Sequence, residues 1–549
     1  MTIHDLTLRE KIGQTAIFRH DLLPFIQDPD EYFAKNPIGA SWVMGHDRTV
    51  YRAIEEKRGN PDCTGYKDEM HLNYINLINS HNRIPVLPVM DANDGIRANK
   101  FEGHATLPFA AGLGAANDPD LAFRYAEAIG QDLRSIGFRW LWSPVVDNAG
   151  VFQNYRSMTC DPERNGILLK AFIEGLHAAG IAGGAKHFPG ADPYEYRDSH
   201  FCTASYSQSL TYWEQTQMPQ FQACIDAGID SIMIGHKTFR AVDDTRVNGA
   251  LLPCTLSYKV ITELLKDRMG FEGVVLTDDV AMKALTAIYE PKKLYVELLR
   301  AGNDMILGPV TLDYIDVIEQ AVLSGDLPES RIDDACRRVL ALKERYGLLE
   351  HKTLVPPTEE ERNAVRENIR AVSRDVAERG MTITANRLNL IPLNRETVKK
   401  VKLVYIGYSD DCEKNLQCAV EEFARHGAEC DYQVGFRPED NATLKDYDLI
   451  VYATFIGMHM PPGGRAFYGE KCLMMRHIMT TCVEKSVGVS FGDPDIYFNY
   501  FTAAPTFVNC YSYTPENAVA FVRGLYGEIP FGTYAPFPLN PITRDNNVY

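Results

Sequence analysis

Two short stretches of this sequence place ionisable side chains where they could do acid/base or nucleophilic chemistry. The first, KHFPGADPYEYRDSH over residues 186–200, ends with Asp198 and His200. Residues two apart in an extended loop point the same way, so Asp198 can hold the His200 ring and favour its protonated form. The pair is a candidate general acid/base, and the alternative is a surface polar pair without a function.

The second stretch, GVVLTDDVAMKAL over residues 273–285, runs from an apolar segment directly into Asp278 and Asp279. Successive side chains of a strand point to opposite faces, so only one of these carboxylates can face the axis of a barrel. A single inward aspartate suits a nucleophile or a stabiliser of a cationic centre. The alternative is that both carboxylates cap the following helix.

The segment from residue 1 to about 345 repeats a pattern that would bring these residues together. Short apolar runs alternate with amphipathic segments, which predicts parallel strands buried on both faces and separated by helices. At this length we expect a (β/α)8 barrel, with its catalytic groups at the C-terminal strand ends. The apolar runs are 38–44, 85–90, 138–146, 181–186, 230–234, 273–276 and 303–307, and the clearest helices are 119–136, 162–179 and 257–269.

Five of the predicted strands end in ionisable or polar side chains, which we expect to converge on one rim of the barrel. These side chains are Asp91, Asp147, Lys186 with His187, His236, and Asp278 with Asp279.

A second α/β pattern follows a proline-containing stretch, HKTLVPP, at residues 351–357. A long helix with one apolar stripe is predicted over 359–379, and strands and helices alternate again from 401. We therefore expect a linker and connecting helix over 346–400 and a smaller three-layer αβα, flavodoxin-like sandwich domain over 401–549, after the barrel of 1–345. No GxGxxG motif follows the first strand of the second domain, so nucleotide binding is not expected there.

The composition excludes several classes of function. The 549 residues carry 56 basic and 73 acidic side chains, a net charge of −17, which disfavours binding to nucleic acid or to an anionic membrane. No apolar run reaches the length of a membrane span, and the first residues lack the apolar core of a signal peptide. The 12 cysteines form no metal-ligand spacing, so neither a metal nor another cofactor is expected. We expect a cytoplasmic enzyme, and the sequence leaves the oligomeric state open, a homodimer included.

Together these motifs resemble glycoside hydrolase family 3, and within it the β-N-acetylhexosaminidase branch. KHFPG at 186–190, DSH at 198–200 and TDD at 277–279 stand in the order typical of that branch. The resemblance extends along nearly the whole chain. It includes PVLPVMD ending at Asp91, SPVVD ending at Asp147, the elements around Arg156 and Asp161, and the tail 524–538.

The resemblance implies a retaining exo-glycosidase that removes terminal β-N-acetylglucosamine from a carbohydrate substrate. Asp278 matches the nucleophile that forms a glycosyl-enzyme, and His200, oriented by Asp198, matches the acid/base. The residues that match sugar ligands are Asp91, Arg156, Lys186 and His187. His236 stands where the branch often has a histidine, and it is either a further substrate contact or a histidine packed at the rim. Alternatives are a β-glucosidase or β-xylosidase of the same family, an N-acetylglucosaminide phosphorylase, and a sugar-binding protein on the same scaffold.

The sequence also departs from the pattern of the branch. Ala191 and Asp192 stand where KHFPG is usually followed by His-Gly, and the loop is one residue longer. DANDGIR at 91–97 keeps Asp91, while Arg97 is a weaker match. Some relatives carry an acidic acid/base on the second domain, which makes Glu470, in the Gly/Pro-rich stretch 460–471, a rival to His200.

Overall fold

The computed structural model shows two compact units. It describes residues 3–43, 67–96, 101–147, 155–350, 353–457 and 466–537. The first unit comprises Met1–Ala105, Ala122–Asp147 and Leu169–Ile369, and the second comprises Thr106–Leu121, Asn148–Leu168 and Arg370–Tyr549.

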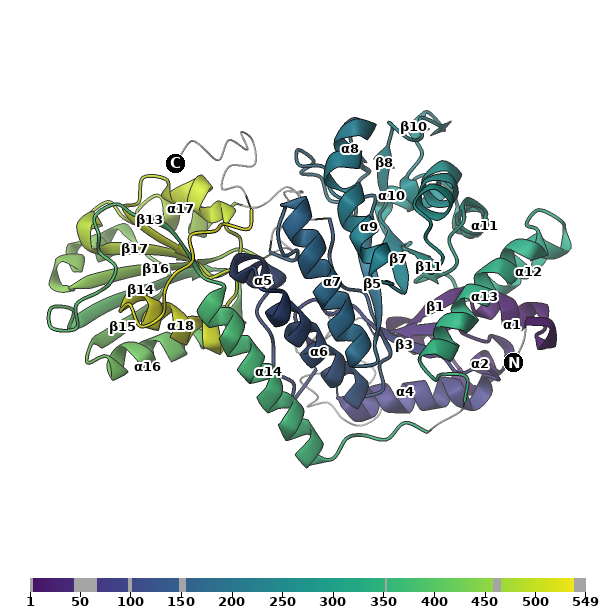
Figure 1. The fold of residues 1–549 in the computed structure, drawn as a ribbon, viewed down its shortest axis with the longest axis horizontal. Coiled ribbons are helices and arrows are strands. Elements are labelled where there is room, and N and C mark those ends of the chain that lie inside the picture. The colour runs from purple at the N-terminus through teal and green to yellow at the C-terminus, as the bar shows by residue number, and fades with distance from the viewer. Residues whose placement is uncertain are drawn as a thin grey trace. The chain divides into compact units, whose positions relative to one another are not determined.

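The first unit contains an eight-stranded parallel barrel, as predicted (Figure 1). Each strand pairs with its neighbour in chain order, and a parallel bridge between Leu276 and Met305 joins the last two strands and closes the ring. The strands are β1 (Ala16–Arg19), β2 (Ala40–Trp42), β3 (Leu87–Met90), β4 (Trp140–Leu141), β5 (Ala182–Phe188), β7 (Ser231–Ile234), β11 (Val274–Thr277) and β12 (Ile306–Leu307).

Two small sheets accompany the barrel. One pairs β6 (Ala204–Tyr206) with β8 (Lys237–Phe239), and the other pairs β9 (Arg246–Val247) with β10 (Ala250–Leu251).

The first of the barrel strands, β1, was absent from the sequence-based prediction. It has only four residues and ends in Arg19, so no long apolar run marks it. Its partners make it a strand, because it pairs in parallel with both β2 and β12.

Helices lie between the barrel strands along the chain, and local capping explains where one of them begins. Asp161 accepts hydrogen bonds from the backbone of Glu163 and Arg164 at the start of α7. The predicted helix 257–269 forms instead as a π-helix, η5 (Lys259–Arg268). The others are α1 (Leu8–Gly13), α2 (Pro29–Lys35), α4 (Asp68–His81), α5 (Ala110–Ala116), α6 (Pro119–Ser135), α7 (Pro162–Ala178), α8 (Leu210–Thr216), α9 (Met218–Asp226), α10 (Lys283–Thr286), α11 (Pro291–Ala301), α12 (Tyr314–Leu323) and α13 (Glu329–Arg345).

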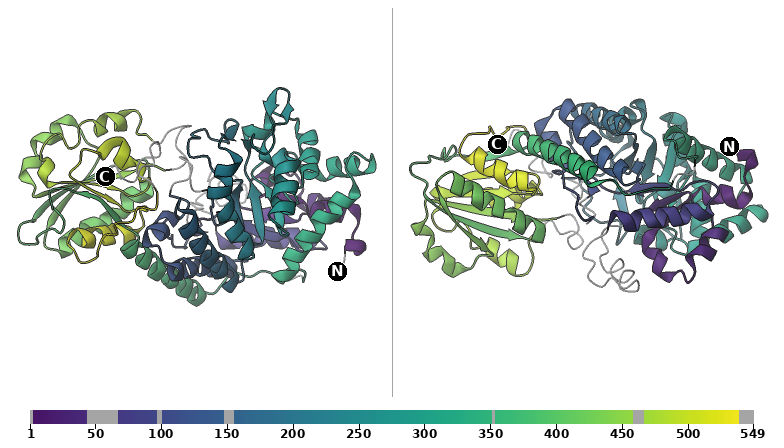
Figure 2. Two further views of the ribbon diagram at one scale, coloured as in Figure 1. Left: turned by 45° about the horizontal axis from the view of Figure 1, so that its top comes forward. Right: turned by 90° about the horizontal axis from the view of Figure 1, so that it is seen from below.

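The second unit is built on a six-stranded sheet in the order β13-β18-β17-β16-β14-β15, in which only β13 runs antiparallel to its neighbour. Alternate residues of β14 pack into two different cores, Val401 and Leu403 into one and Val404 and Ile406 into the other. Figures 1 and 2 show helices on both faces of this sheet, which confirms the predicted three-layer architecture. The elements are α14 (Glu359–Arg379), β13 (Thr382–Asn386), β14 (Lys400–Gly407), α15 (Asp410–Asn415), α16 (Gln417–Arg425), β15 (Glu429–Val434), β16 (Leu449–Phe455), α17 (Glu470–Met475), β17 (Ser486–Ser490), β18 (Thr506–Asn509) and α18 (Pro515–Leu525).

The segment 346–400, expected to be a linker and a connecting helix, contains that helix as α14 and also contributes β13 to the second sheet. The domain boundaries at 345 and 401 stay a prediction.

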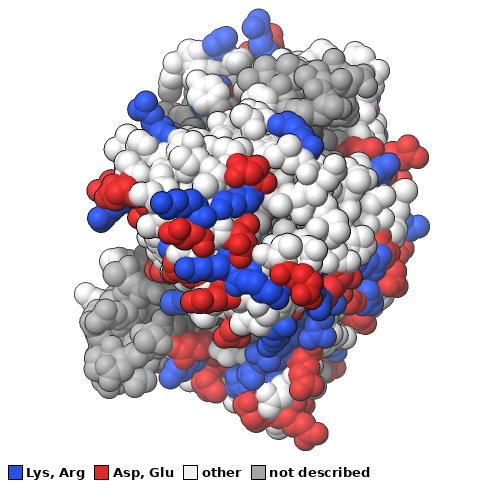
Figure 3. All heavy atoms as spheres, turned by 90° about the vertical axis from the view of Figure 1, so that its left-hand side faces the viewer, with Lys and Arg blue, Asp and Glu red and all other residues white. Residues whose placement is uncertain are grey.

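Acidic and basic side chains are interspersed on the face that Figure 3 shows, so the negative net charge is not gathered there into one patch. Among the described residues, no helix combines the length and apolarity needed to cross a membrane.

Candidate active site

The C-terminal ends of β3 and β5 are joined by an ion pair. Asp91 follows β3, and Lys186 lies near the end of β5, where its side chain is completely buried. Lys186 Nζ donates to Asp91 Oδ1 at 2.5 Å. A buried ammonium needs such a partner, and Asp91 keeps a third of its side chain exposed for a ligand.

Asp147, which follows β4, is a second point of convergence. Its carboxylate is fully buried and lies 3.2 Å from His187 Nδ1 and 3.2 Å from Lys237 Nζ. Lys237 also donates to the carbonyl of Gly190, which ties it to the loop that follows β5. Sequence reasoning missed Lys237, although it directly follows His236 and the strand-end rule, extended by one residue, would have included it.

Asp278 lies at the end of β11 with 21 % of its side chain exposed. Its Oδ2 lies 3.9 Å from His187 Nε2, and its Oδ1 accepts the backbone N–H of Asp279. Burial raises the pKa of Asp278, but the charge of His187 and the Asp279 N–H favour the anion, and the pKa is lowered overall. Asp278 is therefore ionised at neutral pH and keeps an oxygen accessible.

The adjacent carboxylate, Asp279, has a different partner. It pairs with Arg19 at the end of β1, at 3.2 Å. Its backbone carbonyl accepts from His236 Nε2 at 2.9 Å, while His236 Nδ1 lies 2.8 Å from the Thr255 hydroxyl. Both ring nitrogens of the buried His236 are thus engaged within the protein, and the ring holds the strand end that carries Asp278. Arg19 belongs to the strand that the sequence did not reveal.

The predicted Asp198–His200 pair forms. His200 Nδ1 donates to Asp198 Oδ1 at 2.6 Å, and the same oxygen accepts the His200 backbone N–H at 2.9 Å. The hydrogen bond to Asp198 raises the pKa of His200, and the charges of Asp278 and Asp279 act in the same direction. Asp198 is buried, whereas 54 % of the His200 side chain is exposed, so Nε2 is the nitrogen that can exchange a proton with a ligand.

Asp192, one of the departures from the branch pattern, anchors the loop that carries this pair. Its Oδ2 accepts the backbone N–H and the hydroxyl of Ser207, both at 2.6 Å, and its Oδ1 accepts from the Tyr194 backbone at 2.8 Å. Glu195 makes a second anchor by accepting from the Ser205 backbone at 2.8 Å. Buried acceptors of this kind hold an irregular loop in one conformation.

Three other predicted residues do not belong to the described part of the first unit. Arg156 is half-buried in the segment Asn148–Leu168, which is grouped with the second unit. Glu470 is an exposed residue that begins α17 of the second unit. Arg97 lies outside the described residues. Within the described part of the chain, no cluster of three or more His, Cys, Asp or Glu side chains is arranged to hold a metal ion.

An accessible carboxylate and a histidine–aspartate pair, supported by buried ion pairs at the C-terminal end of a parallel barrel, define an enzyme site of the glycosidase type. The model of the "Glycosyl hydrolase family 3 N terminal domain" matches residues 7–342, and the chain belongs to that family. It is a glycoside hydrolase.

A relative supports this assignment, and solved structures share the fold. The "Beta-N-acetylglucosaminidase/beta-glucosidase" of Cellulomonas fimi is 26 % identical over 447 residues, which cover 77 % of this chain and 78 % of the relative. The structure of a family 3 β-N-acetylglucosaminidase from Paenibacillus sp. str. FPU-7 shares the fold, with a TM-score of 0.79, 22 % identity and coverage of 97 % and 99 %. Beta-glucoside phosphorylase BglX also shares it, with a TM-score of 0.81, 19 % identity and coverage of 98 % and 94 %.

Proposed function

We propose that this glycoside hydrolase is a retaining, exo-acting β-N-acetylhexosaminidase that releases terminal β-N-acetylglucosamine. The observation that carries the proposal is the Asp198–His200 pair, because retaining glycosidases need an acid/base in addition to a nucleophile. The ionised Asp278 supports the second role.

The two residues divide the reaction between them. In the first step, an Asp278 oxygen attacks the anomeric carbon, the bond from that carbon to the leaving oxygen breaks, and protonated His200 gives its Nε2 proton to the leaving oxygen. In the second step, neutral His200 takes a proton from water, the water oxygen attacks the anomeric carbon, and the bond to Asp278 breaks. The raised pKa of His200 favours the protonated form that the first step needs.

Sugar binding is assigned to side chains at the strand ends. Asp91, with Lys186 beside it, offers carboxylate oxygens to sugar hydroxyls, and His187 lies next to Asp278. Arg156 is proposed as a further ligand on the resemblance alone. His236 is proposed as a positioning residue, because both of its ring nitrogens already have protein partners.

The choice of sugar is tested by hydrolysis rates. We expect kcat/KM to be higher for 4-nitrophenyl N-acetyl-β-glucosaminide than for the corresponding glucoside and xyloside. The relative from Cellulomonas fimi is named for both of the first two sugars, so all three are compared side by side. A higher value for the glucoside or xyloside would replace the hexosaminidase proposal with that activity.

The acid/base role is tested with leaving groups. His200→Ala should lose at least 100-fold in kcat/KM on glycosides with poor leaving groups, which need protonation, and much less on those with good leaving groups. Full activity on a poor leaving group would exclude His200 as the acid, and the same assay on Glu470→Ala then tests its rival.

Phosphorolysis is the second candidate, favoured by the same histidine. After it has given up its proton, His200 is neutral, so it repels an incoming phosphate less than a carboxylate would. Product analysis with and without phosphate decides the matter: a sugar 1-phosphate indicates phosphorolysis, whereas free sugar alone indicates hydrolysis.

A further inference from the structure

A cavity of about 330 Å³ opens at the N-terminal ends of β4 and β5, the end of the barrel away from the strand ends that carry Asp278 and Asp91. Arg139 immediately precedes β4, and Gly180 lies just before β5. The lining residues are Arg134, Arg139, His177, Gly180, Arg345 and Tyr346. Three arginines thus line one cavity in a chain whose net charge is −17.

One of the three arginines is neutralised. Arg345 pairs with the buried Asp230 at 2.9 Å. The same carboxylate accepts from Tyr346 and is paired with His177, each at 2.9 Å. These contacts fix one wall of the cavity and engage both oxygens of the Asp230 carboxylate.

The other two arginines, Arg134 and Arg139, form no ion pair with a carboxylate of the described residues. Arg134 Nη1 donates to the carbonyl of Ala179, and Arg139 Nη1 donates to the carbonyls of Arg134 and Phe138. Among the described residues, neither guanidinium has an acidic side chain at ion-pair distance, and their Nε and Nη2 groups make no hydrogen bond. Two arginines with unused guanidinium donors therefore line one cavity.

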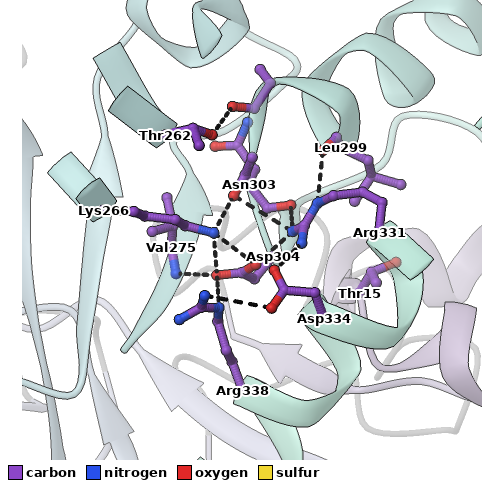
Figure 4. A network of polar contacts seen from close by, with 12 residues as sticks. Thr15, Thr262, Lys266, Val275, Leu299, Asn303, Asp304, Arg331, Asp334 and Arg338 are labelled. Atoms are coloured by element: carbon purple, nitrogen blue, oxygen red, sulfur yellow. Dashed lines mark hydrogen bonds and ion pairs between the residues drawn. The ribbon is translucent and has the colours of Figure 1, made fainter. Parts of the chain in front are cut away.

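Other arginines at this end of the barrel do pair with a carboxylate. Arg331 pairs with the fully buried Asp304 at 2.5 Å, and Arg338 and Lys266 pair with the same carboxylate (Figure 4). In the cavity, burial and the neighbouring charge of Arg134 lower the pKa of Arg139 to about 10. A bound anion would relieve both of these costs.

The backbone also makes room for this arrangement. Gly180 has a φ of +73°, and a Cβ at that position would lie 2.0 Å from Arg134 Nη1. The positive φ of the turn after α7 favours glycine, and a Cβ there would displace the Arg134 guanidinium from the place that it occupies.

We propose that this cavity is a binding site for a small phosphate monoester, separate from the catalytic site. Guanidinium forks match the geometry of a phosphate, and two of them can neutralise its dianion. The cavity is larger than a phosphate group, so it has space for a small organic group beside the Tyr346 ring. The proposal does not depend on which sugar the enzyme hydrolyses.

Isothermal titration of the full chain at constant ionic strength, with inorganic phosphate and with glucose 6-phosphate as probes, tests the proposal. We expect one site for each probe, with tighter binding of the ester, and at least tenfold weaker binding in Arg134→Gln and in Arg139→Gln. The matched control is Arg246→Gln, which removes the same charge from an exposed side chain whose one hydrogen bond to a described residue is to the Gly249 carbonyl. It should bind as the wild type does. Thermal melting of each variant shows that it is folded, and the exposed Arg134 gives a second variant if Arg139→Gln does not fold.

Three results would overturn the proposal. The first is the absence of binding at millimolar concentrations of either probe. The second is equal binding by the wild type and both cavity variants. The third is phosphate binding that survives both substitutions but is lost in saturating N-acetylglucosamine, which would place the anion at the catalytic site instead.

Discussion

Carboxylates of the same chemical type take different roles in this site because their immediate partners differ. Asp278 keeps an accessible oxygen next to His187, and Asp279, one residue later, is paired with Arg19. Asp198 is buried and bonds to the backbone and the ring of His200. The residue type alone does not tell these carboxylates apart, whereas the contacts do.

The first prediction at this scale concerns the pH dependence of catalysis. The bond to Asp198 raises the pKa of His200, so the wild type keeps its protonated acid to a pH above the ordinary histidine value of about 6.5. Asp198→Asn removes the charge, so the alkaline limb of kcat/KM should move to lower pH and kcat should fall. The measurement is a full pH–rate profile of both proteins on a glycoside with a poor leaving group. An alkaline limb at the same pH in both proteins would show that the Asp198 charge does not set it.

At the scale of elements, the loop between β5 and β6 is the part that sequence reasoning could describe least. Its motif identified Asp198 and His200 by type and spacing. The role of Asp192 could not be predicted, because its carboxylate accepts a hydrogen bond from the backbone N–H of Ser207, which is fifteen positions later. Contacts of this range depend on the folded path of the loop.

This loop gives the second prediction. Asp192→Ala removes the buried anchor and should loosen the segment that carries His200, so kcat should fall about 10- to 100-fold on poor leaving groups. The effect on good leaving groups should be much smaller, because attack by Asp278 does not use the loop. Asp226→Ala, a change of the same type on the outer surface of α9, serves as the control. Equal losses on both kinds of leaving group would argue for a general structural defect instead.

The barrel strands show what a sequence pattern can and cannot reveal. Strands with long apolar runs were predicted near their observed positions, and the rule that catalytic groups follow such strands located Asp91, Lys186 and Asp278. The short β1 was missed, and the partner of Asp279, Arg19, was missed with it. In the second sheet, β15 was missed because half-exposed polar residues interrupt its pattern.

A third prediction concerns the network in Figure 4, which surrounds Asp304 just before β12. Asp304, fully buried, pairs with Lys266, Arg331 and Arg338 and so ties β12 to η5 and α13. Asp304→Asn leaves Lys266 without its countercharge and leaves Arg331 and Arg338 with Asp334 alone. It should lower the free energy of unfolding by about 3–5 kcal/mol. Asp326→Asn, which breaks an exposed pair with Arg300, should cost no more than about 1 kcal/mol.

Urea unfolding followed by tryptophan fluorescence measures both variants. The four tryptophans of the chain, Trp42, Trp140, Trp142 and Trp213, all lie in the first unit, so the signal reports on the barrel. Similar losses for the two variants would contradict the structural role of Asp304.

At the scale of the whole molecule, a buried amine links the stability of the first unit to pH. Lys343 in α13 is fully buried and donates to Gln14 Oε1 at 2.6 Å and to the Pro85 carbonyl at 2.7 Å. Burial lowers its pKa to about 7, whereas an unfolded lysine has a pKa of about 10.4. Between these values the unfolded chain binds more protons, so the contribution of this site to stability rises with pH and is lost as the pH falls through 7.

The fourth prediction follows from that sign. The difference in unfolding free energy between the wild type and Lys343→Met should shift in favour of the wild type by about 1.4 kcal/mol per pH unit from about pH 7.5 to 9.5. Tryptophan fluorescence in urea at each pH measures it. The exposed Lys170→Met should show no such slope over this range. A flat difference for Lys343→Met would mean that the amine stays protonated in the folded state.

The two-unit fold and the family assignment account for the architecture, while the proposed mechanism requires a covalent bond between the sugar and Asp278. A 5-fluoro N-acetylglucosaminide, or a 2-fluoro or 5-fluoro glucoside, with an activated leaving group should label the wild type with one sugar. Peptide mapping by mass spectrometry should place that sugar on Asp278. Asp279→Asn, which changes the neighbouring carboxylate, should still be labelled at Asp278, and Asp278→Asn should not be labelled. A label on any other residue, or no label with any of these sugars, would contradict the assignment of Asp278 as the nucleophile.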